Sequence, residues 1–161
     1  MRIGIVSDTH NNLGNVQKIV ELFNAEQVDR IIHTGDITQA KTLDVFAQLN
    51  APMYGVFGNN DMERDALQQA IDAHGFHFVE PPFCVEWAQQ QIIVVHDPLE
   101  FNGHLNTTHT LALHGHTHRH RHETVDTTLI FNPGECAGMM SGYNTIGVVD
   151  LTDLSVELLK F

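Results

Sequence analysis

The sequence predicts an α/β fold in which two β-sheets pack face to face and helices cover them on the outside. In the first half of the chain, short apolar strands alternate with stretches of helical periodicity, and this β-α-β-α-β-α order favours right-handed crossovers and a parallel sheet. In the second half, short β runs separated by turn residues dominate, which is typical of mostly antiparallel sheet. Polar residues recur directly after the apolar runs, where α/β sheets bind ligands.

Three strand–helix units make up the first half. The first helix has Asn11 or Asn12 as its N-cap, and the third has Asp61 as its expected N-cap and Gly75 as its stop. The expected strands are 2–7, 30–33 and 51–56, and the apolar helix positions are Leu13, Val16, Val20 and Phe23, then Ala40, Leu43, Phe46 and Ala47, then Ala66, Leu67, Ala70 and Ile71.

Eight further short runs carry β patterning. No linker separates them from the first half, and 161 residues suit one domain with a sizeable core, so we expect a single domain over 1–161. The expected strands are 76–79, 83–87, 91–95, 110–114, 123–125, 128–131, 144–150 and 155–159.

Composition excludes several classes of function. The chain has 20 acidic and 8 basic residues and a formal net charge of -12, which disfavours binding to long nucleic acid but allows a small phosphorylated substrate at a locally positive site. Cys84 and Cys136 lie far apart and form no disulfide framework, as in a reduced intracellular protein. No segment reads as a signal peptide or membrane span, so we expect a cytoplasmic protein without a membrane partner.

Groups with metal-ligand chemistry follow five of the expected strands. Carboxyl ends of parallel strands share one edge of a sheet, so these groups are expected to meet. A single tetrahedral zinc would leave several of them unused, whereas two metals that share one carboxylate use them all. Nitrogen and oxygen donors without thiolate suit manganese, iron, zinc or cobalt. The groups are Asp8, His10, Asp36, Asn59, His96, His116 and His118.

The same residues form an ordered set of motifs. Asp8-Thr9-His10, Gly35-Asp36, Gly58-Asn59-Asn60-Asp61, His96 and Gly115-His116-Thr117-His118 resemble the calcineurin-like metallophosphoesterases, and in particular their small single-domain prokaryotic phosphodiesterase branch. Asn132-Pro133-Gly134 resembles a loop of that branch.

The resemblance implies a fold and a role for each ligand. The fold would be a four-layer α/β/β/α sandwich of two mixed β-sheets flanked by helices. Asp8, His10 and His118 would hold one divalent transition metal. Asn59, His96 and His116 would hold the other, and Asp36 would bridge the two. Manganese is the expected metal, with iron, zinc, cobalt or nickel as alternatives.

Two positions depart from the family pattern. Many members have a histidine, proposed as a general acid, where this chain has Asn60, and several small members have His-Gly-His where this chain has His96-Asp97-Pro98. His104 could supply an imidazole from the following loop, although we favour exposed loop positions for His104 and His109.

Charge and coordination indicate the chemistry. Two divalent metals with Asp8 and Asp36 leave a net positive pocket that attracts a phosphoester, and a metal-bridging hydroxide would be the nucleophile. The expected catalytic residues are Asp36, Asn59 and His96. With no clear general acid, esters with good leaving groups should react best. The expected activity is therefore a dinuclear metal-dependent phosphodiesterase of small phosphodiesters.

Several alternatives remain open. The chain could be a non-catalytic protein-interaction scaffold on the same fold, a histidine-rich metal buffer, a phosphomonoesterase, or a nuclease of short oligonucleotides. A homodimer is also compatible with the sequence. Within the histidine run, His114 is expected to pack below the site, whereas His120 and His122 are expected to be solvated. His33 reads as a packed core residue, and Glu135 has no assigned role.

Overall fold

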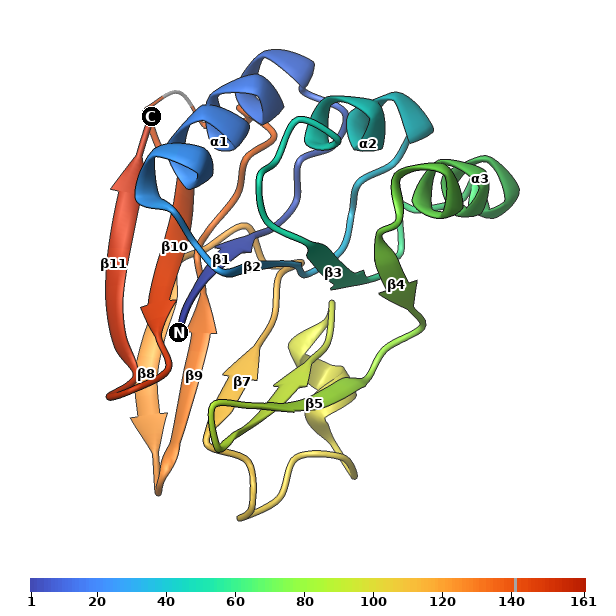
Figure 1. Cartoon of the computed structure of the whole chain (residues 1–161). Coiled ribbons are helices and arrows are strands. Elements are labelled where there is room, and N and C mark those ends of the chain that lie inside the picture. The colour runs from blue at the N-terminus through green and yellow to red at the C-terminus, as the bar shows by residue number, and fades with distance from the viewer. Residues whose placement is uncertain (141) are drawn as a thin grey trace.

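The computed structural model of the chain describes residues 1–140 and 142–161, which form two β-sheets packed face to face (Figure 1). The first sheet has the strand order β11-β10-β1-β2-β3-β4. Its strands β1 to β4 are parallel, and β10 is antiparallel to both β1 and β11. The strands are β1 (Arg2–Val6), β2 (Arg30–His33), β3 (Met53–Val56), β4 (His77–Val79), β10 (Thr145–Asp150) and β11 (Ser155–Lys160).

The second sheet has the order β5-β6-β7-β9-β8 and is also mixed. The expectation of mostly antiparallel pairing in the second half is wrong for its centre, because β6, β7 and β9 are parallel neighbours. Only the outer pairs β5–β6 and β8–β9 are antiparallel. The strands are β5 (Phe83–Trp87), β6 (Gln90–Val94), β7 (Leu111–Leu113), β8 (Arg121–Val125) and β9 (Thr128–Asn132).

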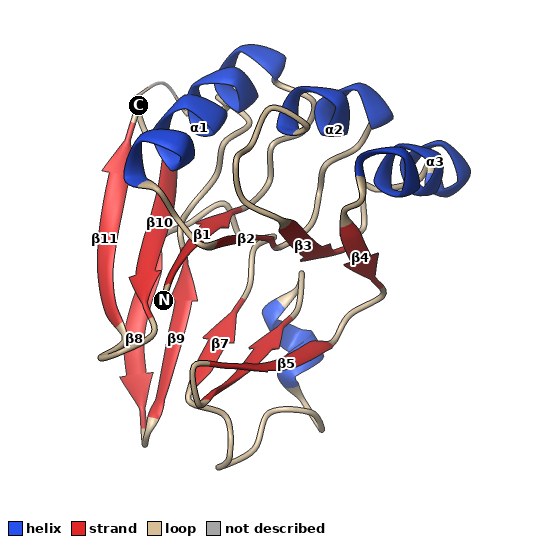
Figure 2. Ribbon diagram, viewed as in Figure 1, coloured by secondary structure: helices blue, strands red, loops and turns tan. Residues whose placement is uncertain are grey.

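Helices α1 (Leu13–Glu26), α2 (Ala40–Phe46) and α3 (Arg64–His74) all cover the outer face of the first sheet (Figure 2). The outer face of the second sheet is covered more thinly, by the 3₁₀ helix η1 (Pro98–Phe101), whose Phe101 packs with Ile93 and Ile130. The expected four-layer arrangement of two mixed sheets is therefore confirmed, with its fourth layer reduced to one 3₁₀ turn.

Apolar strand residues fill the space between the sheets. Ile5 and Ile32 of the first sheet and Leu113 and Phe131 of the second are completely buried in one cluster. A separate cluster joins the first sheet to its helices, where Phe23 of α1 lies against the backbone of β1. Since every central strand is buried on both faces, the strand ends are the places where polar side chains can gather.

Two helix ends test the capping expectations. Asn12 caps α1 by accepting a hydrogen bond from the Asn15 N–H, and Gly75 ends α3 in a left-handed conformation with φ of 70°, both as predicted. The expected cap at Asp61 is wrong, because α3 starts three residues later and its N-cap residue is Glu63.

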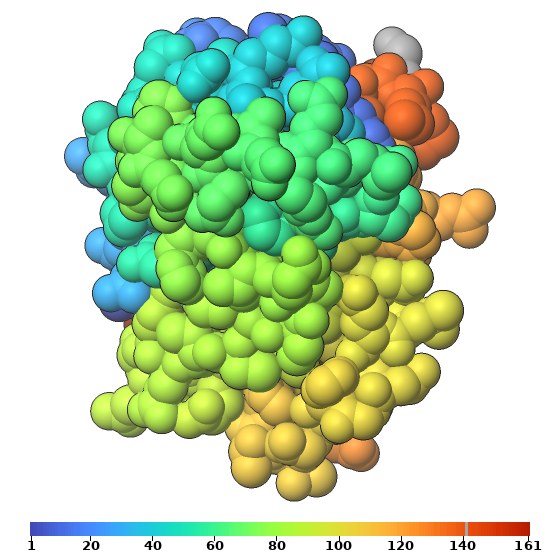
Figure 3. All heavy atoms as spheres, turned by 90° about the vertical axis from the view of Figure 1, so that its right-hand side faces the viewer, coloured from blue at the N-terminus to red at the C-terminus, as the bar shows by residue number. Residues whose placement is uncertain are grey.

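Figure 3 shows the face on which the green atoms of α3 lie above the yellow-green and yellow segment that runs from β5 to the loop after η1. Within the described residues, no helix combines the length and the apolar composition needed to cross a lipid bilayer.

Candidate metal centre

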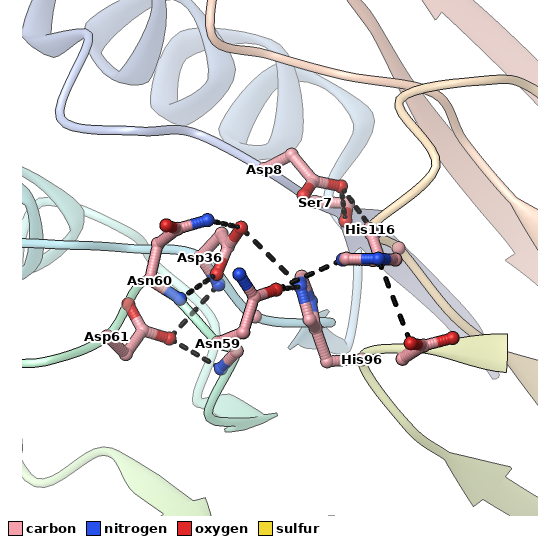
Figure 4. A network of polar contacts seen from close by, with 12 residues as sticks. Ser7, Asp8, Asp36, Asn59, Asn60, Asp61, His96 and His116 are labelled. Atoms are coloured by element: carbon pink, nitrogen blue, oxygen red, sulfur yellow. Dashed lines mark hydrogen bonds and ion pairs between the residues drawn. The ribbon is translucent and has the colours of Figure 1, made fainter. Parts of the chain in front are cut away.

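The loops that follow β1, β2, β3, β6 and β7 converge at one edge of the sandwich (Figure 4). Hydrogen bonds between the loops hold them there. The Asp8 N–H donates to the Gly35 carbonyl at 3.1 Å, and the Gly115 N–H donates to the His96 carbonyl at 3.0 Å. All seven groups singled out from the sequence lie in these loops.

One group consists of Asp8, His10 and His118, whose ligand atoms lie within 4.8 Å of one another. Asp8 Oδ1 is buried without a hydrogen-bond partner, 3.4 Å from His118 Nε2 and 3.8 Å from His10 Nε2. The two imidazole Nε2 atoms face each other at 3.2 Å. When both rings are neutral acceptors, a cation between them satisfies both lone pairs and the carboxylate oxygen.

A second group is centred on the side chain of Asn59. Its Oδ1 lies 2.9 Å from His96 Nε2 and 3.0 Å from His116 Nδ1 (Figure 4). His96 is almost completely buried, whereas the His116 side chain is 41% exposed, so this side of the site is open to solvent. An amide oxygen and two imidazoles are donors that a divalent transition metal accepts.

Asp36 lies where the two groups meet. Its Oδ2 is 3.3 Å from His10 Nε2 and 3.4 Å from His96 Nε2. Asp8, Asp36 and His96 also form a set within 4.8 Å, so both carboxylates are near the middle of the site. Asn60 donates to both oxygens of Asp36, from its backbone N–H at 2.9 Å and from its side-chain amide at 2.7 Å. Asn60 therefore orients Asp36.

The orientation of His96 is set on the side of the ring away from the site. Its Nδ1–H donates to the Thr34 carbonyl at 2.9 Å, which leaves Nε2 to face the ligand groups. Gly35 makes this approach feasible, since a Cβ at this position would lie 2.5 Å from His96 Nδ1, and its φ of 104° suits glycine.

Charges in the site strongly perturb its titratable groups. Burial opposes ionisation of Asp8, but the adjacent imidazoles of His10 and His118 and the hydrogen bond from Ser7 hold the pKa of Asp8 well below its usual range. The pKa of Asp36 falls to about 2, because bonds from His96 and Asn60 outweigh its burial.

For His96, burial favours the neutral ring, but the hydrogen bond and the charge of Asp36 raise its pKa to about 9. The two carboxylates are thus ionised at neutral pH, and in the metal-free protein His96 carries a proton that a cation would displace.

The supporting roles of two residues were not predicted from the sequence. Asp61 is 2% exposed, and its carboxylate accepts backbone N–H groups of Gly58, Asp36 and Thr38 at 2.7, 3.0 and 2.7 Å. Ser7 donates to Asp8 Oδ2 and accepts from Thr34 Oγ1 at 2.7 Å. No sequence signal separates such a role from capping or simple packing.

The remaining histidines lie outside the ligand cluster. His114 is buried beneath it, with its Nδ1 at 3.0 Å from the Gly115 carbonyl, and His120 and His122 are exposed, as expected. His33 is buried, its Nδ1 accepts from the Gly35 N–H, and burial lowers its pKa to about 3. His104 is exposed. The expectation for His109 is wrong, because it is 8% exposed and accepts a hydrogen bond from the Asn106 N–H at 3.2 Å.

The donor set fits two divalent metals. A cation would satisfy the orphaned Asp8 Oδ1 and the facing imidazoles together, and Asn59 Oδ1 is aimed at two further imidazole nitrogens. Gly115 keeps this space open, because a Cβ there would lie 2.8 Å from Asp8 Oδ2. The described residues place no thiolate in the cluster, which favours metals that accept nitrogen and oxygen ligands.

Known proteins resemble this chain over most of its length. Residues 1–154 match the model of the calcineurin-like phosphoesterase superfamily domain. The phosphodiesterase MJ0936 of Methanocaldococcus jannaschii is 36% identical in a 160-residue alignment, and the match covers 93% of each chain. The structure of an archaeal phosphodiesterase superposes over the full length of both chains with a TM-score of 0.89 and 34% identity.

More distant structures share the fold. Yfce, a phosphoesterase from E. coli, has a TM-score of 0.77 and 21% identity over 99% of this chain and 98% of its own. A zinc complex of Vps29 from Entamoeba histolytica has a TM-score of 0.66 and 16% identity over 100% of this chain and 98% of its own. The resemblance inferred from the motifs is confirmed by the domain match and by the relative at 36% identity: the chain belongs to the calcineurin-like phosphoesterase superfamily.

Proposed function

We propose that this protein is a phosphodiesterase that hydrolyses small phosphodiesters with two divalent metal ions, manganese being the proposed metal. The observation that carries the proposal is the position of Asp36 Oδ2, 3.3 Å from His10 Nε2 and 3.4 Å from His96 Nε2, between two clusters of ligand atoms. The activity agrees with that of the relative at 36% identity, which is a phosphodiesterase. We further propose that residues 1–161 form one domain.

Each proposed ligand has a defined task. Asp8, His10 and His118 would hold one metal, Asn59, His96 and His116 the other, and Asp36 both. Bound there, the metals would supply Lewis-acid activation of the phosphoester and of water. Asp8 and Asp36 offset only half of the charge of two divalent ions, so the pocket attracts a phosphodiester although the chain has a net charge of -12.

The leaving group receives little help from position 60. The amide of Asn60 cannot act as an acid, and it is engaged with Asp36 Oδ2 at 2.7 Å. His116 is the exposed imidazole of the cluster, but the proposal assigns it to a metal. Diesters whose leaving group is stable as an anion should therefore react fastest.

The test combines metal analysis with paired substrates. We expect about two metals per chain, faster hydrolysis of bis(4-nitrophenyl) phosphate than of 4-nitrophenyl phosphate, and loss of both metal and activity in Asp36→Asn. Asp72→Asn on the exposed surface of α3 is the matched control. Equal diester hydrolysis by the wild type and Asp36→Asn would contradict the proposal.

A further inference from the structure

A second cavity opens beside His118, outside the ligand cluster. Its volume is about 310 Å³, and it lies between the β9–β10 connection, the end of β11 and the residues that follow His118. Met140, Tyr143 and Leu158 give it an apolar lining, and Arg119 and Lys160 add two cationic side chains. Because His118 lines both spaces, a molecule in this cavity would adjoin a phosphorus atom at the metal centre.

The apolar side chains of this cavity are unusually exposed. Met140 is 49% exposed and Tyr143 is 65% exposed, and the neighbouring Met139 is 65% exposed. Clustered apolar surface on a monomer marks a site that another molecule covers. A rigid aromatic ring with a thioether beside it suits a flat aromatic ligand.

The backbone that presents these side chains is anchored. Glu135 Oε1 accepts the Met140 N–H at 3.1 Å, and the Glu135 side chain is buried. Asn15 Nδ2 of α1 donates to the Cys136 carbonyl at 2.8 Å and to Asn144 Oδ1 at 3.1 Å. The β9–β10 connection is thus tied to α1 through Cys136 and Asn144. Glu135, which accepts the Met140 N–H, supports the cavity wall from beneath.

Charge at the cavity contrasts with that of the whole protein. The chain has only eight basic residues and a net charge of -12, yet Arg119 and Lys160 both line this space. Neither of them takes part in an ion pair within the part of the chain that the structure describes, whereas the nearby Arg121 pairs with Glu123. Two unpaired cations beside an apolar wall favour a ligand that combines a ring with negative charge.

We propose that this cavity binds the nucleoside of a nucleotide substrate whose phosphodiester reacts at the metal centre, an inference that rests on the proposed function. The base packs against Tyr143 and Met140, and Arg119 and Lys160 face the negative charge of a further phosphate. The volume is at the lower end of the range of about 300–1,000 Å³ for small-molecule sites, which suits one nucleoside. Diesters of cationic alcohols such as choline are disfavoured by Arg119 and Lys160.

Binding measurements separate the nucleoside from the phosphates. Calorimetry on the metal-loaded protein would compare α,β-methylene-ADP with methylenediphosphonate, two non-hydrolysable probes that differ by the nucleoside. Stacking of one base on an aromatic side chain predicts about 5- to 150-fold tighter binding of the nucleotide probe. Tyr143→Ala should abolish this preference, and Tyr143→Phe should retain it. Leu99→Ala, at a 71% exposed position on η1, is the control and should leave it unchanged.

The cations and the oligomeric state complete the test. Arg119→Ala with Lys160→Ala should weaken both probes while the preference for the nucleotide persists. Equal affinity of the wild type for the two probes would overturn the proposal. The proposal would also be overturned if light scattering showed that the wild type is a dimer and Tyr143→Ala a monomer, because a second copy would then cover this surface. The readout is binding, so it is independent of whether the wild type hydrolyses an aryl diester, which tests the proposed function.

Discussion

Replacement of Asp61 by Asn should weaken both the fold and the metal site. Asp61 Oδ2 accepts the N–H groups of Gly58 at 2.7 Å and Asp36 at 3.0 Å, and Oδ1 accepts that of Thr38 at 2.7 Å. An Asn side chain has one acceptor oxygen, so its NH₂ group must face a backbone donor. The lost hydrogen bond to a charged group and the buried donor left unpaired together destabilise the fold by about 2–4 kcal/mol.

Thermal unfolding of the metal-free protein measures this loss. At roughly 2–4 °C per kcal/mol for a chain of this size, Tm should fall by roughly 4–16 °C. Asp61 also fixes the backbone of Asp36, so metal affinity measured by calorimetry should fall by about 10–100-fold. The control is Asp72→Asn, whose amide oxygen can still accept the exposed hydrogen bond from Gln68, so stability should change by less than about 0.5 kcal/mol. If Asp61→Asn has the same Tm and the same metal affinity as Asp72→Asn, Asp61 does not support the site.

Three further perturbations probe the same centre. Asn60→Ala removes the side-chain donor from Asp36 but keeps the backbone donor, so metal affinity should fall by about tenfold while Tm changes little; unchanged affinity would show that the backbone donor suffices. Gly115→Ala places a Cβ 2.8 Å from Asp8 Oδ2 and should abolish stoichiometric metal binding measured by elemental analysis; full occupancy would contradict the crowding argument. The pKa of His96 is raised to about 9 from 6.5, so its contribution to metal-free stability is complete below about pH 6.5 and is lost as the pH rises through 9. Since metal must displace this proton, affinity should rise about tenfold per pH unit from 7 to 9 and then level off; equal affinity at pH 7 and pH 9 in calorimetry would refute it.

The strands and the ligand candidates could be predicted because they follow general rules. Apolar runs fix the buried strands, and polar groups directly after parallel strands must share one edge of the sheet. Asp36 was recognisable in this way as a residue at the end of a strand. Its support by Asp61 was not, because an acidic residue just before a helix has the same local pattern whether it caps that helix or accepts N–H groups from another loop.

Pairing between distant segments was also beyond local reasoning. The parallel arrangement of β6, β7 and β9 requires long crossings through η1 and through the β8 hairpin, and no periodicity within a short strand indicates the direction of its neighbour. His109 illustrates the same limit for a single residue. It lies in a polar loop that reads as exposed, but the Asn106 N–H and the Thr128 hydroxyl bond to it and hold it in the interior.

The backbone at the ligand positions shows why the site depends on the whole fold. Five of the seven proposed ligands have a left-handed backbone. This conformation costs residues other than glycine about 1–2 kcal/mol each, so the local sequence opposes it. Contacts between loops compensate for it. The Asp36 carbonyl accepts the His10 N–H at 3.0 Å, and Asp8 Oδ2 accepts the His116 N–H at 3.1 Å. The hydrogen bonds between the loops therefore fix the ligand residues relative to one another, and the centre is preorganised for cations. The positive φ values are 51° at Asp8, 40° at His10, 62° at Asp36, 66° at His116 and 56° at His118.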